Sequence, residues 1–215
     1  MADQIYFSFD GSSLIAQVRH LQRAQPAFKD HKLDVNTLIT RLTHSFLMRD
    51  IMGTGFRRAT LYFAKGDDDQ VERYLTLPDF AKPHSVRDIE VRYCGVKLPR
   101  SKKFDAFVEK KVPDEFQDRF QKSEKGVDIE ICCDALQLAA TGHLERLFLL
   151  TNDSDFIPLC RKLKELGSNV SLLRLSDTRP VNIDLAQACD SYDVFPLHDV
   201  YTSFGLQPPE NLPPF

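Results

Sequence analysis

The sequence predicts an α/β fold in which a mostly parallel sheet lies between two layers of helices. Short apolar runs typical of buried strands alternate with longer segments whose apolar residues recur at helical spacing. The 215 residues, of which 42% are hydrophobic, are enough for one such domain with a substantial core. We therefore expect a three-layer α/β/α domain, and we find no internal repeat.

The first half of the chain should begin with a buried strand over residues 5–9, which ends at Asp10. Helices are expected over 12–24 and 34–51, and Asp34 is the expected N-cap of the second. The other elements expected before residue 99 are a strand over 57–66, a helix over 67–81 with acidic residues in its first turn, and an alternating strand over 87–98.

The second half opens with a polar, partly basic excursion over residues 97–125. A helix over 127–142 and a strand over 144–151 should follow, then a helix over 155–167, in whose first turn Pro158 is tolerated. The expected final elements are a strand over 169–175, a short helix over 182–190 and a strand over 192–197. The domain should therefore span residues 4–197, and residues 198–215 should form a Pro-rich, extended or disordered tail.

Several classes of protein are poor fits to this chain. No segment has 18 unbroken apolar residues, and the N-terminus lacks the pattern of a secretion signal, so we expect a cytoplasmic protein without a membrane span. The five cysteines form no CxxC pair and the six histidines form no zinc-binding grouping. Phosphate-binding loops of the GxxxxGK[ST] and GxGxxG types and a G-x-S-x-G nucleophile motif are also missing from the sequence.

Aspartates gather where a parallel sheet would bind a ligand, beyond the carboxyl ends of its strands. Asp10 ends the first strand, Asp153 ends the strand over 144–151, and Asp155 follows it. Asp128 and Asp134 belong to the helix before that strand. If the two strands are neighbours, these acids converge. Carboxylates that converge repel one another unless a cation lies among them, and oxygen ligands suit Mg²⁺ or Mn²⁺.

Each aspartate also has an explanation that involves no metal. Asp10 with Gly11 is a common turn pair, and Asp155 is a candidate cap of the following helix. Asp128 suits the first turn of a helix, and Asp134 suits a solvated helix face. Asp128 and Asp134 are six residues apart, so their directions on a helix differ by roughly 120°. We therefore expect Asp128 to be the stronger ligand, and Asp134 to hold a water or a second ion.

Three blocks of sequence together resemble the NYN domain, a branch of the PIN-like nucleases that includes the LabA-like bacterial proteins. They are "IYFSFDGSSL" at 5–14, "EKGVDIEICCDAL" at 124–136 and "LFLLTNDSDFIPLCRKLKELGSNVSLL" at 147–173. The family pattern is a strand ending in Asp-Gly-x-Asn-Leu, a Lys-Gly-Val-Asp helix, and Ser-Gly-Asp-x-Asp-Phe before a helix. The blocks occur in that order, and the resemblance implies a PIN-like α/β/α fold and a ribonuclease that depends on a divalent metal.

The resemblance implies that Asp10, Asp128, Asp153 and Asp155 hold Mg²⁺ or Mn²⁺ and position a water against an RNA phosphodiester, with Asp134 as an additional match. Ser13, Asn152 and Ser154 are then expected beside the carboxylates. Ser13 replaces the family asparagine of the first block and reaches less far. Asn152 replaces the glycine before the last acidic pair, and asparagine tolerates left-handed backbone geometry better than most residues.

A basic segment offers a place for the RNA. Between Arg87 and Lys103 there are six Lys/Arg and two acidic residues, a local charge of +4 in a chain whose net charge is −3. Such patches are often solvated surface, but they also bind phosphates in a salt-dependent way. The candidates for backbone contacts are Arg92, Lys97, Arg100, Lys102, Lys103 and Lys125.

Two other functions remain open at this level. A non-catalytic module of the same fold would bind RNA or a protein and use the acids weakly, which the changes at Ser13 and Asn152 favour. A metal-dependent phosphatase acting on small phosphates would use the same acids but would not need the basic segment. The sequence does not decide whether the protein is an oligomer.

Overall fold

The computed structural model describes residues 4–49, 55–79, 88–97, 106–107, 110–111, 124–175 and 180–210. Its main feature is a seven-stranded sheet with the order β6-β5-β3-β1-β7-β8-β9. The strands are β1 (Gln4–Asp10), β3 (Gly55–Lys65), β5 (Ile89–Lys97), β6 (Glu124–Lys125), β7 (Arg146–Leu150), β8 (Asn169–Arg174) and β9 (Ser191–Val194). All pairings in this sheet are parallel except that of β6, which lies antiparallel to β5 at one edge.

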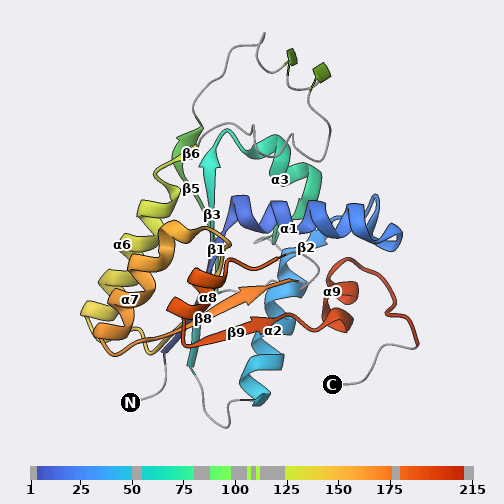
Figure 1. Ribbon diagram of the computed structural model, residues 1–215. Coiled ribbons are helices and arrows are strands. Elements are labelled where there is room, and N and C mark those ends of the chain that lie inside the picture. The colour runs from blue at the N-terminus through green and yellow to red at the C-terminus, as the bar shows by residue number, and fades with distance from the viewer. Residues whose placement is uncertain are drawn as a thin grey trace.

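Helices cover both faces of the sheet, so the predicted three-layer α/β/α fold is confirmed (Figure 1). One layer contains α1 (Gly11–Ala24), α2 (Val35–Arg49), α3 (Asp68–Tyr74) and α9 (Leu197–Ser203). The other contains α6 (Val127–Ala140), α7 (Ile157–Glu165) and α8 (Ile183–Ala188). Neighbouring strand residues divide between the two cores because side chains alternate across a sheet. Leu149 faces the α6 side and Leu150 the α1 side.

The strand order brings the ends of β1 and β7 together. The chain starts at the centre of the sheet, builds outward through β3 and β5, and then crosses to β7 on the other side of β1. Phe9 lies opposite Leu150 in the parallel register. The residues that follow each strand therefore meet at the carboxyl edge, at the switch in strand order where such sheets bind ligands.

The predicted helix over 67–81 is wrong beyond Tyr74. α3 stops there, and Leu75 and Thr76 form strand β4, which pairs in parallel with β2 (Leu33–Asp34) in a separate two-stranded sheet. Leu75 and Leu33 are both buried, so extending the chain at this point secures an apolar pair that a continued helix would lose. Asp34 caps α2 as predicted, because its Oδ1 accepts a hydrogen bond from Thr37 N at 2.8 Å.

The packed part of the chain extends beyond the predicted boundary at residue 197. Residues 197–203, which sequence reasoning assigned to the end of the last strand and to the tail, form α9. Val200 and Phe204 are buried in the core beside α1 and α2, which explains why this segment is helical although the sequence after it is rich in proline. In the described portion of the chain, the helices are too short or too polar to cross a membrane.

Candidate active site

Asp10 links the first strand directly to the first helix. It is 2% exposed, and its carboxylate caps α1. Oδ1 accepts hydrogen bonds from the backbone N of Ser12 at 3.0 Å and of Ser13 at 3.3 Å, and from Ser12 Oγ at 2.8 Å. Oδ2 accepts from Ser13 Oγ at 2.6 Å and from Thr151 Oγ1 at 3.0 Å. A carboxylate held by this many donors is fixed in position.

Gly11 follows Asp10 because no side chain fits at this position. A Cβ there would lie 2.2 Å from Cδ1 of Phe63 and 2.5 Å from the backbone oxygen of Tyr62. The pair Asp10-Gly11 is therefore not a turn, as the sequence alone allowed. The aspartate starts the helix, and the glycine lets the helix start against β3.

Thr151 connects the two strand ends across the sheet. It is completely buried, donates to Asp10 Oδ2, and accepts from the backbone N of Asp153 at 3.2 Å. Sequence reasoning treated this threonine only as the end of a strand. The available signal was its place in the register, one residue beyond a strand that runs parallel to β1, where a hydroxyl faces Asp10.

Asp155, the candidate cap of the following helix, does not cap it, and Asp153 instead caps the short turn before that helix. Asp153 Oδ1 accepts from the backbone N of Asp155 at 2.9 Å and caps a 3₁₀ turn, η3 (Ser154–Phe156). α7 then continues from η3 without a side-chain cap, and Pro158 lies in its first turn as predicted. Asp153 and Asp155 are both exposed and leave oxygens directed to solvent.

The two changes from the family pattern lie next to this site. Ser13 Oγ donates to Asp10 and accepts a hydrogen bond from the backbone N of Asn152 at 3.4 Å. Asn152 Oδ1 accepts from the backbone N of Asn182 at 3.1 Å and so ties the loop to the start of α8. Left-handed geometry is not used at Asn152, since Asp30 is the one described non-glycine residue with positive φ. Ser154 is exposed at the start of η3.

Asp128 is placed by two glycines that meet at the edge of the sheet. Gly126 is the N-cap of α6 with φ of 98°, and Gly95 interrupts β5 at a bulge with φ of 62°. A Cβ on Gly95 would lie 2.4 Å from the backbone oxygen of Lys125. Both positions require glycine, because other residues rarely adopt positive φ and a side chain at Gly95 would clash. The first turn of α6 thereby comes close to the ends of β1 and β7.

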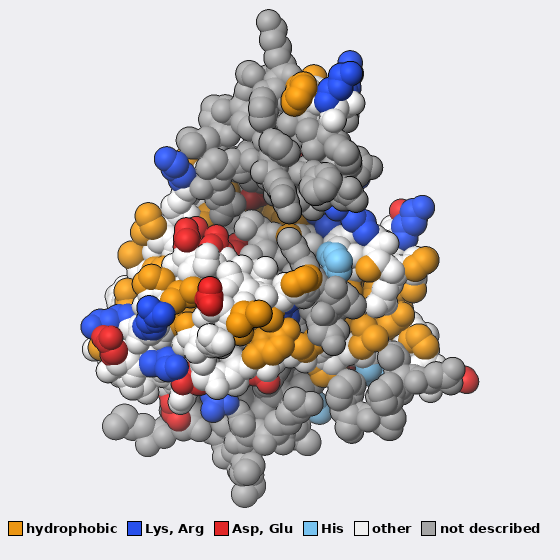
Figure 2. All heavy atoms as spheres, viewed as in Figure 1, with side chains coloured by type: hydrophobic (Ala, Val, Ile, Leu, Met, Phe, Trp, Pro, Cys, Tyr) orange, Lys and Arg blue, Asp and Glu red, His pale blue; other side chains and the backbone are white. Residues whose placement is uncertain are grey.

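The electrostatics show that four of the predicted carboxylates lie near one another. Burial and, to a smaller extent, the charges of Asp10, Asp153 and Asp155 together raise the pKa of Asp128 to about 6. Figure 2 shows acidic side chains gathered near the first turn of α7, beside α6. Among the residues with described positions, however, no three carboxylate, imidazole or thiol groups converge on one point that could hold an ion.

The chemistry of these donors nevertheless fits Mg²⁺ or Mn²⁺. All the donors are oxygens, and a cation would relieve the repulsion that raises the pKa of Asp128. Mg²⁺ in particular keeps several of its waters and is held by one or two carboxylates together with substrate phosphates, so it does not need a closed cage of protein ligands.

Asp134 and Arg92 do not join these carboxylates. Asp134 Oδ2 accepts from Tyr62 Oη at 2.7 Å and forms an ion pair with Arg92, whose guanidinium also binds Glu90 at 2.7 Å. Burial and the bond to Asp134 raise the pKa of Tyr62. These groups line a separate cavity of about 390 Å³ between α6 and the sheet, which also includes His143. The charge of Arg92 is thus already balanced by acids of the protein.

The other predicted RNA contacts are placed only in part. Lys125 is exposed on β6, just before the glycine that starts α6. The backbone of Lys97 pairs with Glu124 in the edge of the sheet. Arg100, Lys102 and Lys103 lie outside the described residues, as does most of the predicted excursion over 97–125.

Comparison with known proteins finds similarity to a protein family and to a solved structure. Residues 10–195 match the NYN domain, which corresponds to most of the chain. A similar solved structure is the crystal structure of a protein of unknown function from Vibrio parahaemolyticus, with 14% sequence identity and a TM-score of 0.49 over 90% of this chain and 93% of that chain. Curated proteins give no match.

Proposed function

Because the chain belongs to the NYN domain family, a family of PIN-like nucleases, we propose that it is a metal-dependent endoribonuclease. The observation that carries this proposal is the approach of Asp10, Asp128, Asp153 and Asp155 at the switch in strand order, where the charges of three of them raise the pKa of the fourth. Burying or crowding carboxylates costs stability, and proteins accept such a cost mainly at functional sites.

The four aspartates would hold Mg²⁺ or Mn²⁺. When bound, such an ion activates a water and neutralises charge on a phosphodiester. Asp10 contributes a carboxylate that is already oriented, because Ser12, Ser13 and Thr151 hold both of its oxygens. Asp153 and Asp155 are exposed, so they can meet an RNA strand and its metal from the solvent side.

The decisive experiment is cleavage of a mixed RNA substrate in Mg²⁺ or Mn²⁺ by the wild type and by Asp153→Asn. We expect at least a hundredfold loss of activity in the variant, with an unchanged melting temperature within a few degrees. Asp134→Asn is the control, because it makes the same chemical change at an aspartate that binds Arg92 and Tyr62 and lies apart from the four proposed ligands. Equal cleavage by the wild type, Asp153→Asn and Asp10→Asn would refute the assignment.

A non-catalytic RNA-binding module of the same fold is the second candidate. It is favoured by the lack, among the described residues, of three side chains that converge on one ion position, and by the replacements at Ser13 and Asn152. A calorimetric titration with Mn²⁺ separates the two candidates. Binding that is lost in Asp128→Asn supports the nuclease, whereas no heat at millimolar Mn²⁺ supports the module.

A further inference from the structure

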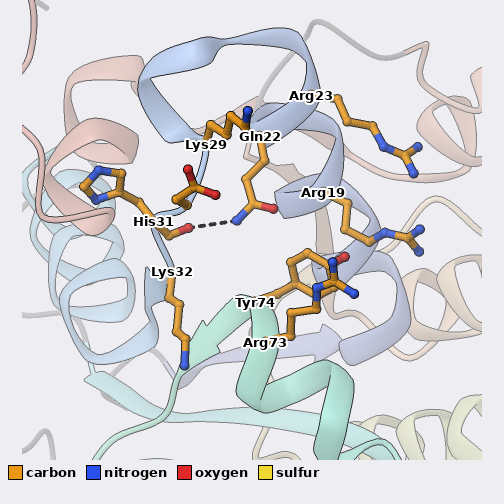
Figure 3. A pocket seen from close by; sticks show the side chains of 9 residues that line it. Arg19, Gln22, Arg23, Lys29, His31, Lys32, Arg73 and Tyr74 are labelled. Atoms are coloured by element: carbon orange, nitrogen blue, oxygen red, sulfur yellow. Dashed lines mark hydrogen bonds between the residues drawn. The ribbon is translucent and has the colours of Figure 1, made fainter.

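A further cavity opens between α1, the segment that follows it, and α3, and its lining includes none of the four aspartates of the candidate active site. Its volume is about 640 Å³. Figure 3 shows that its labelled side chains come from these three segments. The lining residues are Arg19, Gln22, Arg23, Lys29, Asp30, His31, Lys32, Arg73 and Tyr74.

The lining is strongly basic in a protein that is acidic overall. Five of the nine residues are Lys or Arg and one is Asp, while the whole chain has a net charge of −3. Lys29, Lys32 and Arg73 are exposed. Figure 2 shows basic side chains over the side of the molecule formed by α1 and α3. Like charges that are gathered in one concave surface repel one another, and an anion in the cavity would relieve that repulsion.

The cavity is built from fixed parts. The ring of Tyr74 is almost buried, and the guanidinium groups of Arg19 and Arg73 lie 5.8 Å and 5.5 Å from its centroid, at cation–π distance (Figure 3). Gln22 Nε2 donates to the backbone oxygen of His31 at 2.8 Å and holds the loop against α1. Pairing of β2 with β4 ties the same loop to the end of α3. The cations are thus presented by three segments that are fastened to one another.

We propose that this cavity binds phosphate groups of an RNA strand whose other part occupies the candidate active site. The proposal rests on the proposed function. α1 connects the two places, because its first residue follows Asp10 and Arg23 lies on its last turn, ~18 Å further along the helix axis. A single strand that runs along α1 would therefore place phosphates both at the candidate active site and in the cavity. Because the contacts are to phosphates, the cavity adds affinity without sequence preference.

The test measures RNA binding without cleavage, so it does not depend on whether the protein is a nuclease. Fluorescence anisotropy with a labelled single-stranded RNA in EDTA would compare the wild type with the triple variant Lys29→Ala/Lys32→Ala/Arg73→Ala. We expect the variant to bind about tenfold more weakly at about 0.1 M salt, and the slope of log K against log[salt] to fall by about 2. The control is Arg57→Ala/Arg58→Ala/Lys162→Ala, which removes three exposed charges elsewhere.

A variant that should strengthen RNA binding tests the same cavity. Asp30 is the single acid of the lining and has φ of 68°, a conformation that asparagine tolerates. Asp30→Asn should therefore tighten RNA binding by about twofold or more. Unchanged affinity and salt slope in the triple variant would overturn the proposal, as would failure of the wild type to bind RNA. ATP or inorganic triphosphate bound as tightly as the RNA would also overturn it, in favour of a site for free polyphosphates.

If the cavity binds RNA but Asp153→Asn cleaves as the wild type does, only the proposed catalytic site fails. If cleavage requires Asp153 but the triple variant binds and cleaves normally, only the cavity proposal fails.

Discussion

Replacing Asp128 by asparagine should stabilise the protein at neutral pH in the absence of metal. Burial and the charges of Asp10, Asp153 and Asp155 raise the pKa of Asp128 from 3.8 to about 6. A rise of this size corresponds to about 3 kcal/mol of unfavourable free energy in the ionised form. Since Asp128 is only partly buried, solvent screening reduces the expected gain on removing the charge to about 1 kcal/mol.

Because the pKa of Asp128 is raised in the folded protein, the stabilisation by Asp128→Asn depends on pH. The unfolded chain ionises Asp128 near 3.8 and the folded protein near 6, so the folded state binds more protons between these values and loses stability as the pH rises. The loss of stability caused by ionised Asp128 is absent well below pH 3.8 and complete above about pH 6. The gain from Asp128→Asn should therefore be largest near pH 7.5 and about a third as large near pH 4.5.

Urea unfolding in EDTA at these two pH values measures the effect. Glu130→Gln is the matched control, because Glu130 is an exposed acid in the first turn of the same helix and shares the interaction with the helix dipole. The reasoning is refuted if Asp128→Asn lowers the free energy of unfolding near pH 7.5, or raises it equally at both pH values. Saturating Mn²⁺ should reverse the order by stabilising the wild type alone.

Three further changes test other parts of the structure. Thr151→Val should lower the free energy of unfolding by about 1–3 kcal/mol, because it removes a buried donor to Asp10 while the side-chain shape stays the same, and urea unfolding gives the value. Gly11→Ala should cost about 1–3 kcal/mol or more in the same assay, since its Cβ would lie 2.2 Å from the ring of Phe63. Asp134→Asn should lower the melting temperature yet leave the rate of metal-dependent RNA cleavage within about threefold, and a large loss of rate would return Asp134 to the proposed site.

The layers of the fold could be predicted from the sequence because its periodicity is unambiguous. Apolar runs such as the one that ends at Asp10 are buried on both faces, and the helices that follow carry clear apolar stripes. The missed elements depend on contacts between distant segments. β4 forms because Leu75 meets Leu33, and α9 forms because Val200 and Phe204 reach the core, and neither contact leaves a periodic signal nearby.

The arrangement of the candidate site could be predicted in its positions but not in its hydrogen bonds. Parallel topology alone places Asp10 and Asp153 at neighbouring strand ends. It does not reveal that Asp153 caps the 3₁₀ turn, or that Arg92 neutralises Asp134, because these depend on side-chain directions set by tertiary packing. The role of the aspartates as metal ligands stays a prediction.

The parallel contact between β1 and β7 has a consequence for how the protein is made. It joins residues 5–9 to residues 146–150, with β3, β5 and α6 between them in the chain. A growing polypeptide therefore carries Asp10 long before it carries Thr151 and Asp153, and the core is closed only when Val200 and Phe204 have been added. Contacts of such long range form late in folding. The carboxylates can assemble only after Thr151 and Asp153 have been synthesised, so the ribosome must translate these codons before the site exists.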